Sequence, residues 1–250
     1  MTEQRGTLRQ TAGLLAVALM VLVLSGCGHR YAAITNKHGE DLMLLGHDPV
    51  AYFTLGKPTR GNPEIKANFR DVTYYFASEQ HRRLFLADPA KYEPQYGAFC
   101  SSGAPYGVKL GSDPTEFEVY KGRLFIFGDV VGHEFWKLDP DWNIEKADAM
   151  WPETGAYGRR IQSLKRAIFR VPWHKTGRVL MDEWEAKHPG YTLVYDPGGY
   201  LHNMFVKYPG WRAREGWDQP ALGVPGEWDD DPSVYPKRPD RRAPVPKAKT

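Results

Sequence analysis

Two segments in which apolar and polar residues alternate across a short turn constrain the fold of this chain more than any other feature. Residues 65–76 alternate about a turn at 70–71, and residues 117–126 alternate about a turn at 121–122. A period of two buries one face of an extended strand, and a polar turn folds one strand back on the other. Each segment therefore predicts a β-hairpin with one buried face.

Helix signals follow the first hairpin directly. Ser78 is placed as the N-cap of a helix that runs to about Ala87 and points Leu84 and Phe85 inward. The Asp-Pro pair at 88–89 ends this helix and begins a short second one, because proline suits the first helical turn. The many glycines and prolines, 25 and 20 in the chain, favour turns over long helices. We therefore predict an α+β fold, followed by a mixed C-terminal extension.

Two further segments have less regular patterns. The Gly-His-Asp-Pro sequence at 46–49 predicts a turn that leads into a short strand at 50–53. Asn143 is placed to cap a helix whose apolar stripe ends at Trp151, and Pro152 is expected to close that helix.

The N-terminus has the features of an export signal. Arg5 and Arg9 precede an apolar run at 14–24, which is short for a membrane span and typical of a signal peptide. Small residues then lead to Cys27, in an arrangement that resembles the signal of a bacterial lipoprotein. We therefore predict a signal peptide at 1–26, lipidation of Cys27 and a place in the bacterial cell envelope, facing the periplasm. An uncleaved N-terminal anchor helix is the alternative.

Composition divides the rest of the chain. We expect a tether at 27–40, a folded domain at 41–152, a C-terminal extension at 153–222 and a Pro-rich, disordered tail at 223–250. Removal of the signal peptide takes away two Arg and one Glu, which lowers the formal charge from +3 to +2 and gives no indication of nucleic-acid binding. The expected partners are the membrane, through the N-terminal lipid, and a protein of the envelope.

The extension contains a strongly basic segment with helical spacing at 157–170. This pattern suits either a helix on an anionic membrane or an ordinary solvated helix. Residues 178–187 predict another helix, and alternation at 191–195 before the turn at 196–199 predicts a hairpin. The tryptophans of the extension are expected to pack on the first domain: Trp173, Trp184, Trp211 and Trp217.

Cys100 is the one cysteine that remains once Cys27 carries a lipid. In an oxidising compartment, an unpaired cysteine is a reactive thiol, a metal ligand or a buried apolar residue. As a thiolate it would suit Cu or Zn. The sequence contains no phosphate-binding loop, nucleophile elbow or helical zinc motif, so nothing in it supports an enzyme positively.

Several motifs resemble the YHS domain family in its longer, secreted bacterial form. They lie within residues 41–152 and comprise Gly46 to Phe53, Tyr74-Tyr75-Phe76, Phe85, Asp88-Pro89, Lys91-Tyr92, Pro94 to Gly97, Cys100, Gly122 to Phe127, Trp136, Asp139, Asn143-Ile144, Lys146-Ala147-Asp148 and Trp151-Pro152. The resemblance implies a small α+β domain, and related domains in metal-handling proteins imply transition-metal binding. The chain departs from the family pattern at His47, where Tyr is common, and after the cysteine, where Ser101 and Ser102 follow.

The predicted metal ligands are Cys100, His47 and His81, with His133 as a further candidate, because a closed zinc site needs about four N or S donors. Each has an alternative role. Cys100 could be a packing residue, His47 a turn residue bonded to local backbone, and His81 a solvent-facing residue.

Tyr52, Tyr74 and Tyr96 are candidates to line a pocket, and a place in the core or at its rim is the alternative. Together these features predict a membrane-tethered YHS-like lipoprotein that binds a transition metal through Cys100. The alternative is a non-catalytic structural or protein-interaction lipoprotein of the envelope.

Overall fold

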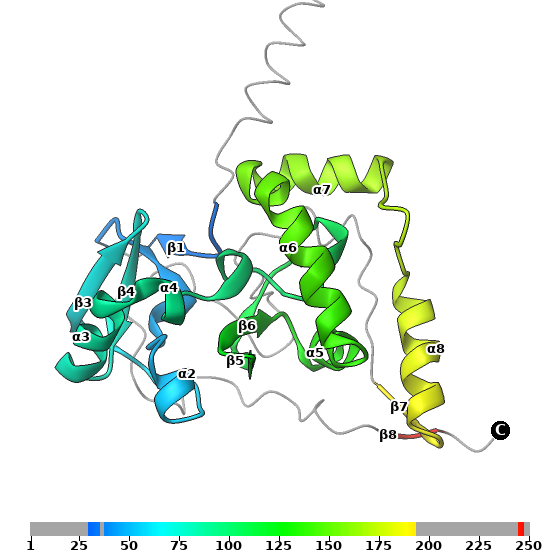
Figure 1. Ribbon diagram of the computed structural model, residues 1–250, viewed down its shortest axis with the longest axis horizontal. Coiled ribbons are helices and arrows are strands. Elements are labelled where there is room, and N and C mark those ends of the chain that lie inside the picture. Colours follow the sequence, from blue (N-terminus) through cyan, green and yellow to red (C-terminus); the bar gives the residue numbers. More distant parts are fainter. Residues whose placement is uncertain (1–29, 36–37, 194–244, 248–250) are drawn as a thin grey trace, which may run out of the picture.

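The structure is a computed structural model that describes residues 30–35, 38–193 and 245–247. Figure 1 shows two groups of elements side by side, one formed by the N-terminal part of the described chain and the other by residues further on. Each group contains an antiparallel hairpin and short helices, which confirms the predicted α+β fold. No helix in the described part combines the length and apolar character that crossing a membrane requires.

The first group is built on a four-stranded sheet with the order β1-β2-β4-β3. Its hairpin consists of β3 (Asn62–Phe69) and β4 (Val72–Phe76), and this hairpin confirms the first sequence prediction. The short strand β2 (Asp41–Leu42) pairs parallel with β4 and antiparallel with β1 (Ile34–Thr35).

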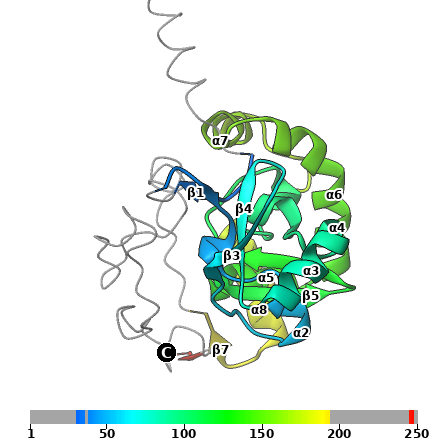
Figure 2. The same ribbon diagram turned by 90° about the vertical axis from the view of Figure 1, so that its left-hand side faces the viewer.

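Helices α3 (Glu79–Ala87) and α4 (Pro89–Tyr92) follow the hairpin as predicted, and both lie beside it in Figure 2. The side chain of Ser78 accepts a hydrogen bond at the start of α3, and Asp88 does the same for α4. The prediction for Leu84 was wrong, because its side chain is 37% exposed while its neighbour in sequence is fully buried.

A helix replaces the strand predicted after the Gly-His-Asp-Pro turn. The 3₁₀ segment η1 (Met43–Gly46) precedes the turn, and α2 (Ala51–Thr54) follows it. The Oδ1 atom of Asp48 accepts hydrogen bonds from the backbone N–H groups of Val50 at 2.8 Å and Ala51 at 3.3 Å. The buried carboxylate therefore starts a helix where local propensity favours an extended chain.

The second group has the same order of elements. The second predicted hairpin is confirmed and consists of β5 (Asp113–Tyr120) and β6 (Arg123–Phe127). The remaining elements of this group are η2 (Gln95–Ala98), η3 (Ala104–Tyr106), α5 (Val130–Lys137) and α6 (Pro140–Ala156).

Helix α6 differs from its prediction at both ends. Its N-cap is Asp139, while Asn143 lies inside the first turn and donates its side-chain amide to the carbonyl of Trp136 at 3.0 Å. Pro152 lies within the helix rather than at its end. The helix continues past the proline to Ala156, and Thr154 in the following turn is fully buried.

The two groups repeat one another along the chain. Strand β3 begins at Asn62 and β5 at Asp113, 51 residues later, and the same offset relates β4 to β6. Each hairpin has a register shift after its first pair, between Asn62 and Lys66 in one and between Asp113 and Phe117 in the other. We call residues 42–92 the first unit and residues 94–143 the second unit.

Side-chain packing follows the same repeat. Phe85 on α3 contacts three rings of its hairpin, and Trp136, 51 residues later on α5, contacts the equivalent three rings. These rings belong to Phe69, Tyr74 and Phe76 in the first unit and to Tyr120, Phe125 and Phe127 in the second. One packing pattern therefore builds the core of both units.

The C-terminal extension contains the predicted helices α7 (Arg159–Ile168) and α8 (Gly177–Lys187). Two of its tryptophans bond to the second unit as expected. The Nε1 of Trp173 donates to the carbonyl of Pro105, and the Nε1 of Trp184 donates to Glu134, each at 3.0 Å. Trp211 and Trp217 lie outside the described residues.

The short strand β7 (Tyr191–Thr192) pairs with β8 (Val245–Pro246), and β8 lies in the segment predicted to be a Pro-rich tail. The rest of the hairpin predicted after β7 lies outside the described residues.

Candidate functional site

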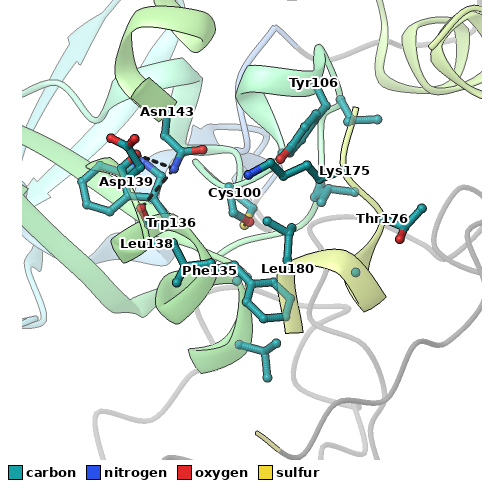
Figure 3. A pocket seen from close by; sticks show the side chains of 18 of the residues that line it. Cys100, Tyr106, Phe135, Trp136, Leu138, Asp139, Asn143, Lys175, Thr176 and Leu180 are labelled. Carbon is teal, nitrogen blue, oxygen red and sulfur yellow. Dashed lines mark hydrogen bonds between the residues drawn. The ribbon is translucent and has the colours of Figure 1, made fainter. Parts of the chain in front are cut away.

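A pocket of about 940 Å³ lies between the second unit and the segment that leads into α8. Figure 3 shows apolar and aromatic side chains around it, with Cys100 at its inner end. The apolar wall includes Tyr106, Val108, Leu110, Phe135, Trp136, Trp142, Trp173 and Leu180. This wall gives the pocket the character of a small-molecule site, which is concave and mainly apolar with a few polar groups.

Among the described residues Cys100 is a free thiol, and it is 3% exposed. Its Sγ lies 3.0 Å from the Oγ of Ser102, and the backbone N–H groups of Ser102 and Gly128 also hydrogen-bond to the sulfur. Burial raises the pKa of the Cys100 thiol, so the group is protonated at neutral pH. A protonated thiol is a poor nucleophile and a poor metal ligand.

The polar groups of the pocket are mostly bonded within the protein. Lys175 and Glu183, which both line the pocket, form an ion pair at 2.8 Å, and the amide of Asn143 bonds to backbone carbonyls. Trp136 also lines the pocket, but its Nε1 is buried within the protein and has no hydrogen-bond partner among the described residues.

In the second unit, Cys100 takes the place that Asp48 takes in the first. The backbone N–H of Asp48 donates to the carbonyl of Thr59 at 2.8 Å, and that of Cys100 donates to the carbonyl of Leu110 at 3.2 Å. Asp48 precedes Cys100 by 52 residues, whereas Thr59 precedes Leu110 by 51, so the loop between them is one residue shorter in the second unit.

The donors around the two side chains match as well. The carboxylate of Asp48 accepts from the backbone N–H of Val50 and, at 2.8 Å, from that of Ala77. Their equivalents, 52 and 51 residues later, are Ser102 and Gly128, whose N–H groups hydrogen-bond to the sulfur of Cys100. The same backbone cradle thus holds a carboxylate in one unit and a thiol in the other.

His81 completes the site in the first unit. Its Nδ1 donates to the Oδ2 of Asp48 at 2.6 Å, and its Nε2 lies 3.2 Å from the Oγ1 of Thr54. Its side chain is only 13% exposed, so the solvent-facing alternative for His81 was wrong. The ring packs inward because a fully buried carboxylate needs a charge-assisted donor.

His47 is a buried turn residue, as its alternative role predicted. Its Nδ1 donates to the carbonyl of Leu44 at 2.9 Å, which fixes the ring against local backbone. Burial, together with Arg60 nearby, lowers the pKa of His47 to about 3. The imidazole is therefore neutral at every pH at which the protein is expected to be folded.

The predicted ligands Cys100, His47 and His81 each bond to a different partner, and no group of three or more His, Cys, Asp or Glu residues in the described chain is placed to hold a metal ion. His133 stacks on Phe127 and lies 3.1 Å from a carboxylate oxygen of Glu118. The surroundings of the Cys100 sulfur therefore do not fit a multidentate zinc or copper site. Metal binding through Cys100 stays a prediction from the family resemblance.

None of the tyrosines predicted to line a pocket contributes to the wall of this one. Tyr52 is fully buried and donates to the carbonyl of Pro114 at 2.8 Å, and Tyr74 is fully buried in the first unit. Tyr96 is also buried and donates to Asp148 at 3.0 Å. The three belong to the core and its rim, which was their alternative role. Cys27, the predicted lipidation site, lies outside the described residues.

Comparison with protein-family models, curated proteins and solved structures found no match for this chain.

Sequence reasoning missed Asp48, which holds the equivalent site of the first unit, and Gly132, which lines the pocket. A search for internal repeats could have found them, because the offset of 51 aligns the Asp-Pro pair at 88–89 with that at 139–140. The same offset aligns His81 with Gly132. The loss of a side chain at that position is what leaves room beside Cys100.

Proposed function

We propose that this chain is a non-catalytic binding module tethered in the cell envelope, and that the pocket beside Cys100 binds a small, largely apolar molecule. The observation that carries this proposal is the aromatic wall of a pocket of about 940 Å³, which is large enough for a drug-sized ligand. Cys100 contributes a neutral thiol to the inner end of this pocket. A binding role agrees with the raised pKa of the thiol, which argues against nucleophilic catalysis.

A pocket-filling substitution tests the binding role. Leu180 lines the pocket, whereas its neighbour on α8, Val179, is 42% exposed and does not. Leu180→Trp should lower the affinity of the fluorescent probe anilinonaphthalene sulfonate at least tenfold, and Val179→Trp should leave it unchanged. Equal affinities for wild type and Leu180→Trp, with both proteins folded by circular dichroism, would remove the proposed site.

The rate of thiol alkylation tests the state of Cys100. Because burial raises the pKa of this thiol, iodoacetamide should modify it more slowly than a free cysteine in the same solution. Alkylation as fast as that of the free amino acid would restore the reactive-thiol alternative.

The tether proposal is supported by the surface nearest the start of the described chain. Residues 157–170 contain five Arg and Lys and no Asp or Glu. Ile168 and Phe169, at the end of α7, are 64% and 65% exposed. Arg30 begins the described chain three positions after Cys27. Its charge acts on Lys109, whose ammonium donates to the carbonyl of Tyr157 just before α7. A lipid on Cys27 would hold this basic, apolar surface close to anionic lipid headgroups.

Vesicle binding tests this surface without depending on the lipid. The mature chain, residues 27–250 with Cys27→Ser, should bind vesicles that contain phosphatidylglycerol and release them in high salt. Ile168→Glu/Phe169→Glu should weaken binding about tenfold or more. Leu55→Glu/Leu86→Glu should not weaken it. These positions are 51% and 50% exposed and belong to the end of α2 and to α3, which lie far from α7 in Figure 2. The mass of the chain extracted from membranes tests the acylation of Cys27 separately.

A further inference from the structure

The two units differ at one helical position that decides whether a pocket forms. In the first unit, the ring of His81 fills the space between Asp48 and Thr54 and bonds to both. The equivalent residue of the second unit, 51 positions later on α5, is Gly132. Gly132 has no side chain and lines the pocket, as does Cys100. The space that an imidazole occupies in one unit is therefore open to the pocket in the other.

We infer that this space, between Cys100 and Gly132, is a subsite for a small aromatic nitrogen heterocycle of the imidazole class, bound where the His81 ring lies in the first unit. This inference rests on the proposed binding function and names the chemistry of its ligand.

The groups around the subsite suit such a ring. The edge of the ring meets Cys100, as the edge of the His81 ring meets Asp48, and a ring N–H donates to the sulfur or a ring nitrogen accepts from the thiol. The faces of the ring meet the aromatic wall, to which Phe135 and Trp136 contribute.

Position 132 can accept a histidine side chain like that of His81 in the first unit. A Cβ atom on Gly132 would lie 2.9 Å from the Oγ of Ser102 and 3.6 Å from the sulfur of Cys100. The closer of these contacts is to the end of a small side chain that can rotate away, and the backbone of Gly132 is helical. Gly132→His is therefore expected to fold and to place its own imidazole in the subsite.

Titration with imidazole, followed by amide NMR shifts, tests the subsite. Wild type should bind imidazole with an affinity in about the millimolar range expected for so small a ligand, with shifts at Cys100 and Gly132. Gly132→His should weaken this binding at least tenfold, because the added ring takes the place of the ligand. The control Leu86→His adds the same side chain at an exposed position of the first unit and should bind like wild type.

A second variant keeps the test informative if Gly132→His does not fold. His81→Gly removes the ring from the first unit, and imidazole should then raise the melting temperature of this variant more than that of wild type. Failure of wild type to bind imidazole, or unchanged binding by folded Gly132→His, would overturn the inference. Retained binding of anilinonaphthalene sulfonate in that case would leave the proposed pocket standing, whereas loss of both ligands would remove the pocket as well.

Discussion

The first and second units share a backbone and a packing pattern, yet they bury different polar groups at the same point of that backbone. In the first unit, the carboxylate of Asp48 is closed off by His81. In the second, the thiol of Cys100 sits in the equivalent cradle beside Gly132 and faces a pocket. The difference shows how a repeated fold can turn one copy of a structural site into an opening.

The physical reason lies in what each group needs when it is buried. A carboxylate out of water needs several donors, and backbone N–H groups alone leave part of its charge uncompensated. A thiol is neutral and weakly polar, so the same N–H groups are enough for it. Once Cys100 stands in the cradle, a histidine at position 132 is no longer required. The glycine there costs the second unit little and leaves a pocket.

The largest effect should come from removal of the partner of the buried carboxylate. His81→Ala leaves Asp48 with backbone donors only, and this should lower the free energy of unfolding by about 3–5 kcal/mol. The matched change in the second unit, Gly132→Ala, should alter it by less than about 1 kcal/mol, because the added methyl favours the helix and Ser102 can move. Urea unfolding at neutral pH measures both. Similar losses for the two variants would mean that the units are not equivalent in the way described.

Substitutions that copy Asp48 and His81 into the second unit should show that a buried carboxylate there also depends on a histidine. Cys100→Asp alone places a carboxylate in the cradle without its histidine and should cost about 4 kcal/mol. Addition of Gly132→His should recover about 3 kcal/mol of this loss, because the new pair copies Asp48 and His81. The coupling is measured by urea unfolding of the two single variants and the double variant. Additive effects of the two substitutions on the free energy of unfolding would contradict the equivalence of the two sites.

At acidic pH, the stability of the fold should depend mainly on a histidine of the first unit. Burial lowers the folded-state pKa of His47 to about 3 from an ordinary value of 6.5, so the unfolded chain binds more protons between these two pH values. The contribution of this group to stability is therefore present above about pH 6.5 and is lost as the pH falls towards 3, by up to about 5 kcal/mol.

The second unit has Phe99 at the equivalent position, 52 residues later, where nothing titrates. His47→Phe should accordingly flatten the acid side of the stability profile, measured by urea unfolding at a series of pH values. A profile as steep as that of wild type would assign acid sensitivity to other groups.

How far the sequence predicts this molecule depends on how local each signal is. Ser78 and Asp88 cap helices that begin at the next residue, and the two hairpins turn within a few residues, so these features were predicted. The carboxylate of Asp48 bonds to groups 29 and 33 residues away. No local pattern marks those contacts. They hold Asp48 in the position from which it bonds to Val50 and Ala51 at the start of α2, and this short helix was predicted as a strand.

The pocket was beyond sequence reasoning for a related reason. Cys100 was identified as a site of interest, but the wall around it comes from segments as far apart as Tyr106 and Leu180. Tyr96, a nearby tyrosine that was predicted to line a pocket, is buried and donates to Asp148 instead. The one signal within reach was the 51-residue offset, and few identities support it, such as Phe76 with Phe127 and Pro89 with Pro140.

At alkaline pH, the stability of the fold should depend on a lysine of the second unit. Lys109 is fully buried, and desolvation lowers its pKa to about 8 from 10.5, although its ammonium donates to the carbonyl of Tyr157 at 2.7 Å. Between these pH values the unfolded chain binds more protons, so stability should rise with pH, by up to about 3 kcal/mol.

Position 58, 51 residues before Lys109, is a proline, so the first unit has no lysine at the equivalent position. Lys109→Met should abolish the rise in stability between pH 8 and 10.5, and exposed Lys57→Met should keep it. Thermal unfolding across this pH range measures the difference. Equal slopes in the two variants would show that the buried ammonium is not the source.

The smallest effects should come from a feature that both units retain. The side chain of Asp88 accepts from the backbone N–H of Lys91 at 3.3 Å, and that of Asp139 accepts from the N–H of Trp142 at 3.0 Å. Because both are N-caps before a proline, Asp88→Ala and Asp139→Ala should each cost about 1 kcal/mol, and the Asn variants should restore most of it.

Urea unfolding of the four cap variants measures these small differences. Equal losses would show that the units still obey the same local rules and differ only where Asp48 and Cys100 stand. A much larger loss for Asp139→Ala would show that the second unit depends on its cap for more than the start of α6. Asp139 lines the pocket, so in that case the cap and the pocket would be parts of one structure rather than independent features.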